Sequence, residues 1–311
     1  MSKKTSYLLG IVLTIILGTI LYYFLCCSVC CNAEKGANNQ DEAKSVVSPK
    51  IKEITKNAFL INDANGDFNL KLNDNFNFKT SNFSIEEPVS KDIENGVLKL
   101  KDYLIENPLK NINITGLYRS DETNNSAYPN LGLARANSVK NYFVLHGVSS
   151  KQIDTNGKLN DTINPDENST LFGPVSFNML TADASDASSM EALKTACDAI
   201  KENPLVLHFK TGQASINLTA EQRQKIADIS HCVDKLGVKM QVIGHTDNTG
   251  DAARNIVLGQ ERADFAKVYL TQNGILDSNI ETSSQGPKVP VADNATEEGR
   301  AENRRTVITI N

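Results

Sequence analysis

The chain has 311 residues, of which 40% are hydrophobic and 22% are charged, and its net charge at pH 7 is −5. This length suffices for two ordinary domains, and the composition is that of a globular protein. Because the net charge supplies no basic field, the composition argues against nucleic acid as a partner.

An uncharged, apolar run dominates the N-terminus. It covers residues 7–31, follows two lysines, and exceeds the roughly 20 residues that cross a bilayer. The run lacks the small-x-small cleavage site of a signal peptide, and the lysines favour a cytoplasmic N-terminus. The sequence therefore predicts an uncleaved transmembrane anchor over residues 1–31, with the bulk of the chain on the periplasmic side.

The six cysteines fall into two groups. Those at the end of the apolar run are Cys26, Cys27, Cys30 and Cys31. No further cysteine or histidine pair lies nearby, so palmitoylation or membrane packing explains them better than a metal cluster, and a processed, lipoprotein-like signal remains an alternative. Cys197 and Cys232 lie much later, where an oxidising compartment would permit a disulfide. Pairing and two buried thiols are both compatible with the sequence.

Folded structure is predicted to begin near Ala58, after a polar linker over residues 32–57. Alternating apolar residues on both sides of Asn65-Gly66 predict a β-hairpin, because Asn-Gly is a strong two-residue turn signal. Asp63, Asn65 and Asp67 also fit part of a calcium loop. The glycine falls too early for EF-hand spacing, so we favour the hairpin.

One sequence pattern occurs twice. Leu131-Gly-Leu-Ala-Arg-Ala136 matches Leu258-Gly-Gln-Glu-Arg-Ala263, and the match continues without a gap. The further matched positions are Lys140, Tyr142, Gly147 and Ile153 with Lys267, Tyr269, Gly274 and Ile280. The sequence therefore predicts two copies of one unit, repeat 1 (residues 58–180) and repeat 2 (residues 190–311), separated by a stretch rich in Ala, Asp, Ser and Thr.

Each repeat is predicted to fold as strand, helix, strand, helix, strand. The elements expected in repeat 2 are the strand Leu205–Lys210, a helix from the capping box Thr219-x-x-Gln222 to Gly237, the strand Val238–Ile243, a helix from about Asp251 to Gly274, and the strands Ile280–Ser284 and Thr306–Ile310. The second helix is expected to bury Leu258, Ala263, Ala266 and Leu270. Strand–helix–strand crossovers imply parallel pairing, which predicts an α+β class with a mixed sheet and helices on one face.

Polar side chains gather where the strand Val238–Ile243 ends. Asp247 and Thr249 follow the strand, and the next helix would carry Asn255 and Arg262 seven residues apart, on one face. Such crevices bind ligands in α/β units, and free N–H groups at a helix start favour anions. A carboxylate and a guanidinium on one rim are complementary to a zwitterion, so the pattern predicts a zwitterion clamp.

Repeat 2 resembles the OmpA-like domain found at the C-terminus of OmpA, Pal and MotB proteins. The motifs that carry the resemblance are Gly244-His-Thr-Asp247, Asn255-x-x-Leu258-x-x-x-Arg262-Ala263, Tyr269-Leu270, Gly274, Gly299-Arg300 and Asn303-Arg304-Arg305, over about residues 203–311. One departure is Gly259, where the family usually has serine.

The resemblance implies non-covalent binding of peptidoglycan through the diaminopimelate of the peptide stem. By position, Asp247 and Arg262 would grip its amino and carboxylate ends, and Thr249, Asn255 and Arg305 would line the same site. Arg304 and Arg305 are adjacent, so we expect one of the two to be structural. No cofactor and no metal is implied.

Repeat 1 retains the arginine of the clamp, as Arg135, but not its acid. The matched positions are Arg119 or Ser120 for Asp247 and Tyr128 for Asn255, and the nearest acids that could substitute are Asp121 and Glu122. We therefore expect repeat 1 to keep the fold, to have lost this ligand, and to act as a spacer or to bind a protein partner.

The predicted function is a non-enzymatic tether between a membrane and the cell wall, in the envelope of a Gram-negative-type bacterium. A protein–protein adaptor without wall binding is the alternative. A motor stator is disfavoured because residues 7–31 contain no Asp or Glu. A wall hydrolase is disfavoured because the four histidines lack HxxE or HxH spacing. The pattern does not identify the membrane, the oligomeric state or the partner of repeat 1.

Overall fold

The structure is a computed structural model that describes residues 53–64, 66, 68–181, 187–208 and 216–311. The predicted anchor, residues 1–31, and most of the predicted linker lie outside the described residues. Within the described ranges, no helix is both long and apolar enough to cross a membrane. The two repeats belong to one compact unit, Lys52–Asn311.

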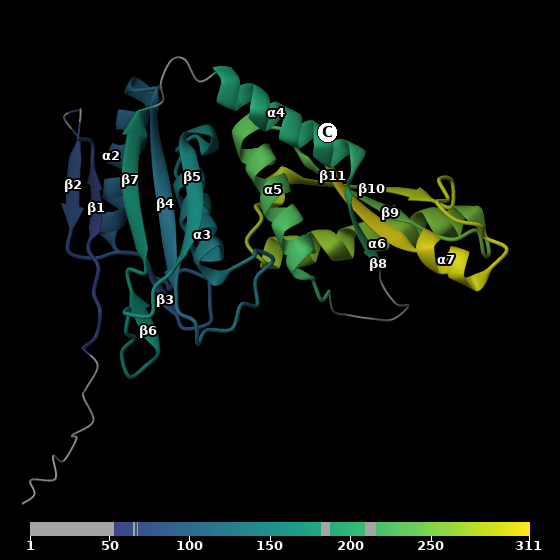
Figure 1. Cartoon of the computed structure of the whole chain (residues 1–311), viewed down its shortest axis with the longest axis horizontal. Coiled ribbons are helices and arrows are strands. Elements are labelled where there is room, and N and C mark those ends of the chain that lie inside the picture. The colour runs from purple at the N-terminus through teal and green to yellow at the C-terminus, as the bar shows by residue number, and fades with distance from the viewer. Residues whose placement is uncertain (1–52, 65, 67, 182–186, 209–215) are drawn as a thin grey trace, which may run out of the picture. The chain divides into compact units, whose positions relative to one another are not determined.

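Both repeats have the predicted α+β class (Figure 1). The elements of repeat 1 are β1 (Phe59–Asn62), β2 (Asn69–Leu72), β3 (Asn77–Lys79), α2 (Lys91–Glu106), β4 (Lys110–Tyr118), α3 (Leu131–Leu145), η2 (Ser150–Gln152), β5 (Ile153–Leu159), β6 (Thr170–Phe172) and β7 (Val175–Thr181). The second half of the chain contains α4 (Ala187–Glu202), β8 (Leu205–His208), α5 (Ala220–Leu236), β9 (Met240–His245), α6 (Ala252–Gln272), η3 (Asp277–Asn279), β10 (Ile280–Gly286), α7 (Glu297–Asn303) and β11 (Arg305–Ile310).

The main sheet of repeat 2 is mixed, with strand order β10-β9-β11-β8. The crossover through α6 joins the parallel neighbours β9 and β10, as predicted. The crossover through α5 does not join neighbours, because β11 lies between β8 and β9 and pairs antiparallel with both. The final strand therefore fills the centre of the sheet, and its start at Thr306 lies beside Gly244, near the end of β9.

Repeat 1 has a sheet of the same design, in the order β5-β4-β7, with β4 parallel to β5 and antiparallel to β7. The strand β3 does not join this sheet but pairs with β6. The predicted hairpin is confirmed, since β1 and β2 pair antiparallel with Phe59 opposite Leu72.

Helix boundaries follow the predicted signals closely. Thr219 caps α5 through a capping box with Gln222, and the helix ends at Gly237, whose φ of 73° is left-handed. Asp251 caps α6, and Gly274 follows its end with a φ of 96°. These ends are set by local side-chain and backbone preferences, which is why the sequence alone located them.

A close helix–strand approach corrects the predicted buried stripe of α6. Ala263, Ala266 and Leu270 are buried as expected, but Leu258 is 39% exposed. Its neighbour Gly259 faces β9 instead. A Cβ added to Gly244 would lie 1.7 Å from the carbonyl oxygen of Gly259, so the helix backbone rests directly on the strand. Any side chain at this crossing would force the two elements apart.

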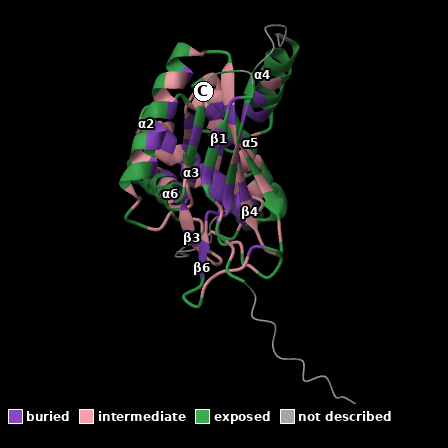
Figure 2. Cartoon of the chain, turned by 90° about the vertical axis from the view of Figure 1, so that its left-hand side faces the viewer, coloured by how far each residue is buried: buried purple, intermediate pink, exposed green. Residues whose placement is uncertain are grey.

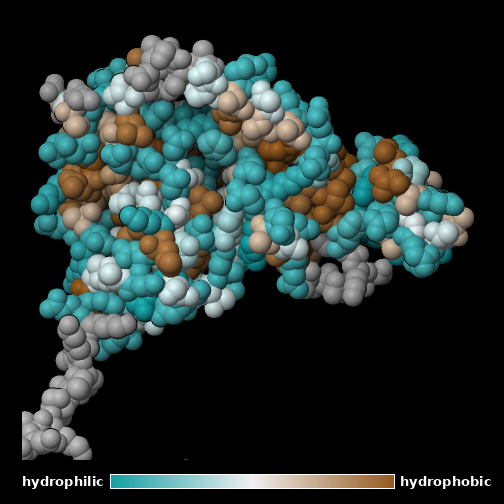
Figure 3. Space-filling view, viewed as in Figure 1, coloured by the Kyte–Doolittle hydropathy of each residue, from teal (hydrophilic) through white to brown (hydrophobic). Residues whose placement is uncertain are grey.

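The described residues form two hydrophobic cores, one mainly in each repeat. In Figure 2 the buried residues follow the strands and the inward faces of the helices. Hydrophilic residues cover much of the face in Figure 3, and hydrophobic residues appear there as separate patches. A disulfide between Cys197 and Cys232 joins α4 to α5 and decides between the two alternatives for these cysteines.

Candidate ligand-binding site

The loop from β9 to α6 holds Asp247 at the carboxyl end of the strand. The Asp247 carboxylate accepts the Thr249 backbone N–H at 2.9 Å, and the buried Asn255 donates its side-chain amide to the Thr249 carbonyl at 3.0 Å. The Thr246 N–H bonds to the Gly286 carbonyl of β10 at 3.0 Å. The loop is therefore fixed both to the helix and to the neighbouring strand.

Arg262 lies on α6 with its guanidinium directed back toward the end of β9. Its Nη1 donates to the His245 carbonyl at 2.8 Å, and this is its one hydrogen bond to another described residue. A guanidinium has five N–H donors, so this bond orients the group and uses only one of them. Burial lowers the pKa of Arg262, and the charge of Asp247 acts in the opposite direction.

Arg304, rather than Arg305, lies beside the clamp. Arg304 donates to the Asp247 carboxylate at 2.8 Å and to Glu297 at 2.8 Å. Arg305 is 5% exposed and donates to the carbonyls of Val289 and Asn303. Arg305 thus holds the connection between β10 and β11, whereas Arg304, at the end of α7, faces Asp247. The sequence did not indicate which of the two arginines faces Asp247.

The charges around Asp247 keep it ionised. Burial raises its pKa, but the hydrogen bonds from Arg304 and Thr249 outweigh this effect, and the pKa is lowered from its ordinary value. The same contacts, first Asp247 and then Glu297, raise the pKa of Arg304. Acidic and basic side chains therefore alternate around the site, from Glu297 to Arg304 to Asp247. Such alternation is complementary to a zwitterion.

A groove of about 540 Å³ adjoins the loop at the N-terminus of α6. Its lining includes Thr249, Arg254, Asn255, Leu258 and Glu261. Two of the predicted site residues, Thr249 and Asn255, therefore lie on its wall. The exposed side chain of Leu258, expected in the core, supplies an apolar wall instead.

His245 is buried behind the clamp. Burial, with the charge of Arg305, lowers its pKa to about 4, and its Nδ1 has no hydrogen-bond partner among the described residues. The imidazole is thus neutral at pH 7. Across the described part of the chain, no group of three His, Cys, Asp or Glu side chains is placed to hold a metal.

The matching position of repeat 1 is closed. Arg135 is fully buried, and its guanidinium binds both oxygens of Glu122. The remaining N–H groups donate to the carbonyls of Lys79, Asn82 and Leu117. All five donors are satisfied within the repeat, so none remains for a ligand carboxylate. Glu122 does replace the missing acid, but as a structural partner of the arginine.

Fold and site together define a tandem α+β protein whose second repeat carries acidic and basic side chains in alternation around Asp247. The model of the OmpA family matches residues 77–170 and 208–304, which is more than half of the chain. The chain belongs to the OmpA family. This is a family of binding proteins and not of enzymes.

Two curated relatives are similar to this chain over part of its length. The peptidoglycan-binding protein ArfA of Mycobacterium tuberculosis is 35% identical over 120 residues, which are 38% of this chain and 36% of ArfA. The peptidoglycan-associated lipoprotein of Buchnera aphidicola is 43% identical over 70 residues, 22% of this chain and 40% of that protein. The chain thus matches well under two thirds of either relative.

Among solved structures, the C-terminal domain of Helicobacter pylori MotB is 28% identical, with a TM-score of 0.29, and the match covers 35% of this chain and 84% of that domain.

Proposed function

We propose that repeat 2 binds peptidoglycan non-covalently, by recognising the diaminopimelate of the peptide stem. The observation that carries the proposal is that Arg262 of α6 donates to the carbonyl of His245, two residues before Asp247, and that its other N–H groups bind no described residue. The carboxylate would hold the ammonium group of the ligand, and the unused donors of the guanidinium would hold its carboxylate. The names of the relatives ArfA and peptidoglycan-associated lipoprotein support this ligand class.

The remaining residues have distinct roles in the proposal. Asn255 and Thr249 fix the loop and offer polar groups on the groove wall, where the rest of the peptide stem would lie. Arg304 replaces Arg305 as the second site arginine, because it orients Asp247. With an anchor at residues 7–31, such a domain would tether a membrane to the cell wall.

Sedimentation with isolated diaminopimelate-type peptidoglycan tests the proposal. Residues 52–311 are expected to pellet with the wall, and Asp247→Ala and Arg262→Ala are each expected to lower the bound fraction at least about tenfold, because each removes a charge-assisted contact. Asp228→Ala, which removes an exposed carboxylate of α5, is the matched control and is expected to bind as wild type does.

Circular dichroism would establish that each variant is folded. Wild-type protein that stays in solution would contradict the proposal and favour an adaptor that binds other proteins. Full binding by the folded Asp247→Ala variant would instead place the wall site elsewhere.

A further inference from the structure

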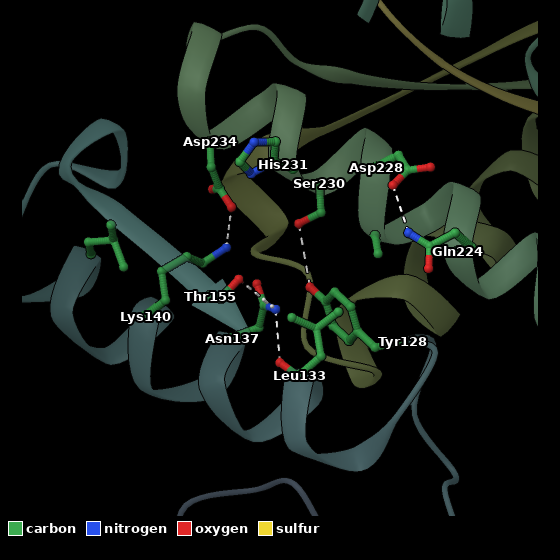
Figure 4. Close-up of a pocket in the computed structure, with 12 residues that line it drawn as sticks. Tyr128, Leu133, Asn137, Lys140, Thr155, Gln224, Asp228, Ser230, His231 and Asp234 are labelled. Carbon is green, nitrogen blue, oxygen red and sulfur yellow. Dashed lines mark hydrogen bonds and ion pairs between the residues drawn. The ribbon is translucent and has the colours of Figure 1, made fainter. Parts of the chain in front are cut away.

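Repeat 1 inserts a tyrosine into the core of repeat 2. Tyr128 precedes α3, is 1% exposed, and belongs with Ala127 and Ala134 to the hydrophobic cluster that contains Ile226 and Ile229 of α5. Its hydroxyl lies 3.4 Å from Ser230 Oγ of α5 (Figure 4). Burial raises the pKa of Tyr128, so the hydroxyl stays neutral in this position. The core of repeat 2 thus includes side chains of repeat 1 and is shared between the two repeats.

A buried ion pair lies beside this tyrosine. The Lys140 ammonium of α3 contacts the Asp234 carboxylate of α5, and the two side chains are 4% and 8% exposed. Figure 4 shows both pointing into a cavity of about 160 Å³ between the helices. A buried charge that loses its partner is strongly destabilising, so this pair favours one register of α3 on α5 over shifted ones.

Polar contacts surround the shared core. The hydrogen bonds and ion pair that join the repeats at its edge include Asn141 to the Gly274 carbonyl at 2.7 Å, Ser150 to the Asp234 carbonyl at 2.8 Å, and Lys235 to the Asp154 carboxylate at 2.8 Å. An apolar centre enclosed by polar contacts is the organisation of a specific interface. These contacts all join α3 and the segment after it to α5 and the segment after α6.

The same positions have other partners in repeat 2. The gap-free match places Tyr128 on Asn255, which binds its own loop at the candidate ligand site. It places Lys140 on Lys267, which pairs with Asp277 of its own repeat at the surface. Repeat 1 therefore uses two matched positions for contact between repeats, where repeat 2 uses them within itself.

The surface of α5 that contacts α3 is also specific to one repeat. Aligning the N-caps of α2 and α5, Ser90 and Thr219, places Ile105, which is 66% exposed, at the position of Asp234. Helix α2 thus lacks the acid that Lys140 requires. The contact therefore requires α3 of repeat 1 and α5 of repeat 2. It is not a general property of the fold.

We propose that the partner of repeat 1 is repeat 2 of the same chain, and that docking of α3 onto α5 makes the two repeats one rigid body that unfolds cooperatively. Loss of the ligand site and gain of this interface are then linked, because Tyr128 replaces the residue that helps to form the site in repeat 2. A mechanical force on repeat 1 would then be transmitted to the ligand site through the packed helices α3 and α5, and not through a hinge.

Calorimetry on residues 52–311 tests the proposal. The expected result is one thermal transition whose calorimetric and van't Hoff enthalpies agree. Lys140→Glu is expected to split it into two transitions, because it places two like charges in the interface. The double variant Lys140→Glu/Asp234→Lys is expected to restore a single transition. Lys267→Glu, the matched lysine of repeat 2, is the control and is expected to keep one transition.

Two separate transitions in the unmodified protein would overturn the proposal, whatever the variants do. A single transition in Lys140→Glu, at the wild-type midpoint, would also overturn it. Hydrogen exchange gives an independent readout, since docking predicts that amides near Asp234 lose protection in Lys140→Glu and regain it in the double variant.

Discussion

At the scale of single residues, Arg304 controls the charge state of the proposed clamp. Arg304→Gln is expected to weaken muropeptide binding about tenfold at pH 7, since it removes one charge-assisted hydrogen bond that orients Asp247. Arg304 holds the pKa of Asp247 down against burial, so in the variant that pKa rises. The loss of binding on acidification should then begin at a higher pH than in wild type.

The measurement is muropeptide affinity between pH 7 and pH 4. Arg300→Gln is the control, because Arg300 pairs with Glu297 and does not contact Asp247. If Arg304→Gln lost affinity over the same pH range as wild type, that result would contradict the role given to Arg304.

His245 makes stability depend on pH. Its pKa in the folded protein is about 4, below the ordinary 6.5, so the unfolded chain takes up a proton that the folded chain does not. The free energy of unfolding should therefore fall as pH decreases from about 6.5 to about 4, by roughly 2–3 kcal/mol from this residue. His231, whose pKa is also lowered by burial, acts in the same direction.

Urea denaturation at pH 7 and at pH 4.5 would measure this effect. His245→Gln is expected to lose less stability on acidification than wild type does. His208→Gln, at an exposed imidazole, serves as the control and should behave as wild type. An equal loss in His245→Gln and wild type would show that protonation of other groups dominates.

At the scale of elements, glycines set the distance between helix and strand in both repeats. A Cβ at Gly244 would lie 1.7 Å from the Gly259 carbonyl, and a Cβ at Gly116 would lie 2.0 Å from the Gly132 carbonyl. Gly244→Ala is expected to lower the free energy of unfolding by about 3 kcal/mol, because backbone atoms must move. It should also displace α6, which carries Arg262, and so weaken ligand binding.

Gly96→Ala provides the comparison. This glycine lies within α2, where a new Cβ would first meet the flexible end of Leu70 at 3.0 Å. Its effect on stability should stay within about 1 kcal/mol, since alanine also favours the helix. Similar costs for the two substitutions would contradict the close crossing described for β9 and α6.

Local signals in the sequence predicted several element boundaries. The hairpin at Asn65-Gly66, the capping box of α5 and the glycines after α5 and α6 depend on neighbouring residues only. The helices α4 and α7 were not predicted. The disulfide joins α4 to α5. The pairing of β3 with β6, rather than with the main sheet, depends on distant segments that no local pattern reveals.

The candidate site was predicted less completely than the fold. The sequence pattern placed Asp247 after β9 and Arg262 on α6, and in the structure Arg262 donates to the carbonyl of His245, two residues before Asp247. The choice between Arg304 and Arg305 depends on how the chain turns from α7 into β11, which the sequence did not specify. The closure of repeat 1 by Glu122 likewise depends on the fold of a loop around a buried arginine.

At the scale of the whole molecule, the two repeats are unequal. Repeat 2 has an oriented arginine with unused donors, whereas repeat 1 has an arginine whose donors are all satisfied internally. Tandem copies of a binding domain would normally raise avidity through a high effective concentration. This chain should instead hold the wall through a single site, with repeat 1 docked on repeat 2.

The most direct test of a single binding site in repeat 2 is a calorimetric titration of residues 52–311 with a soluble muropeptide that contains diaminopimelate. We expect one ligand per chain and complete loss of the binding heat in the folded Asp247→Ala variant. Two ligands per chain, or binding that persists in Asp247→Ala, would contradict this expectation, because repeat 1 would then carry a functional site that its satisfied arginine does not allow.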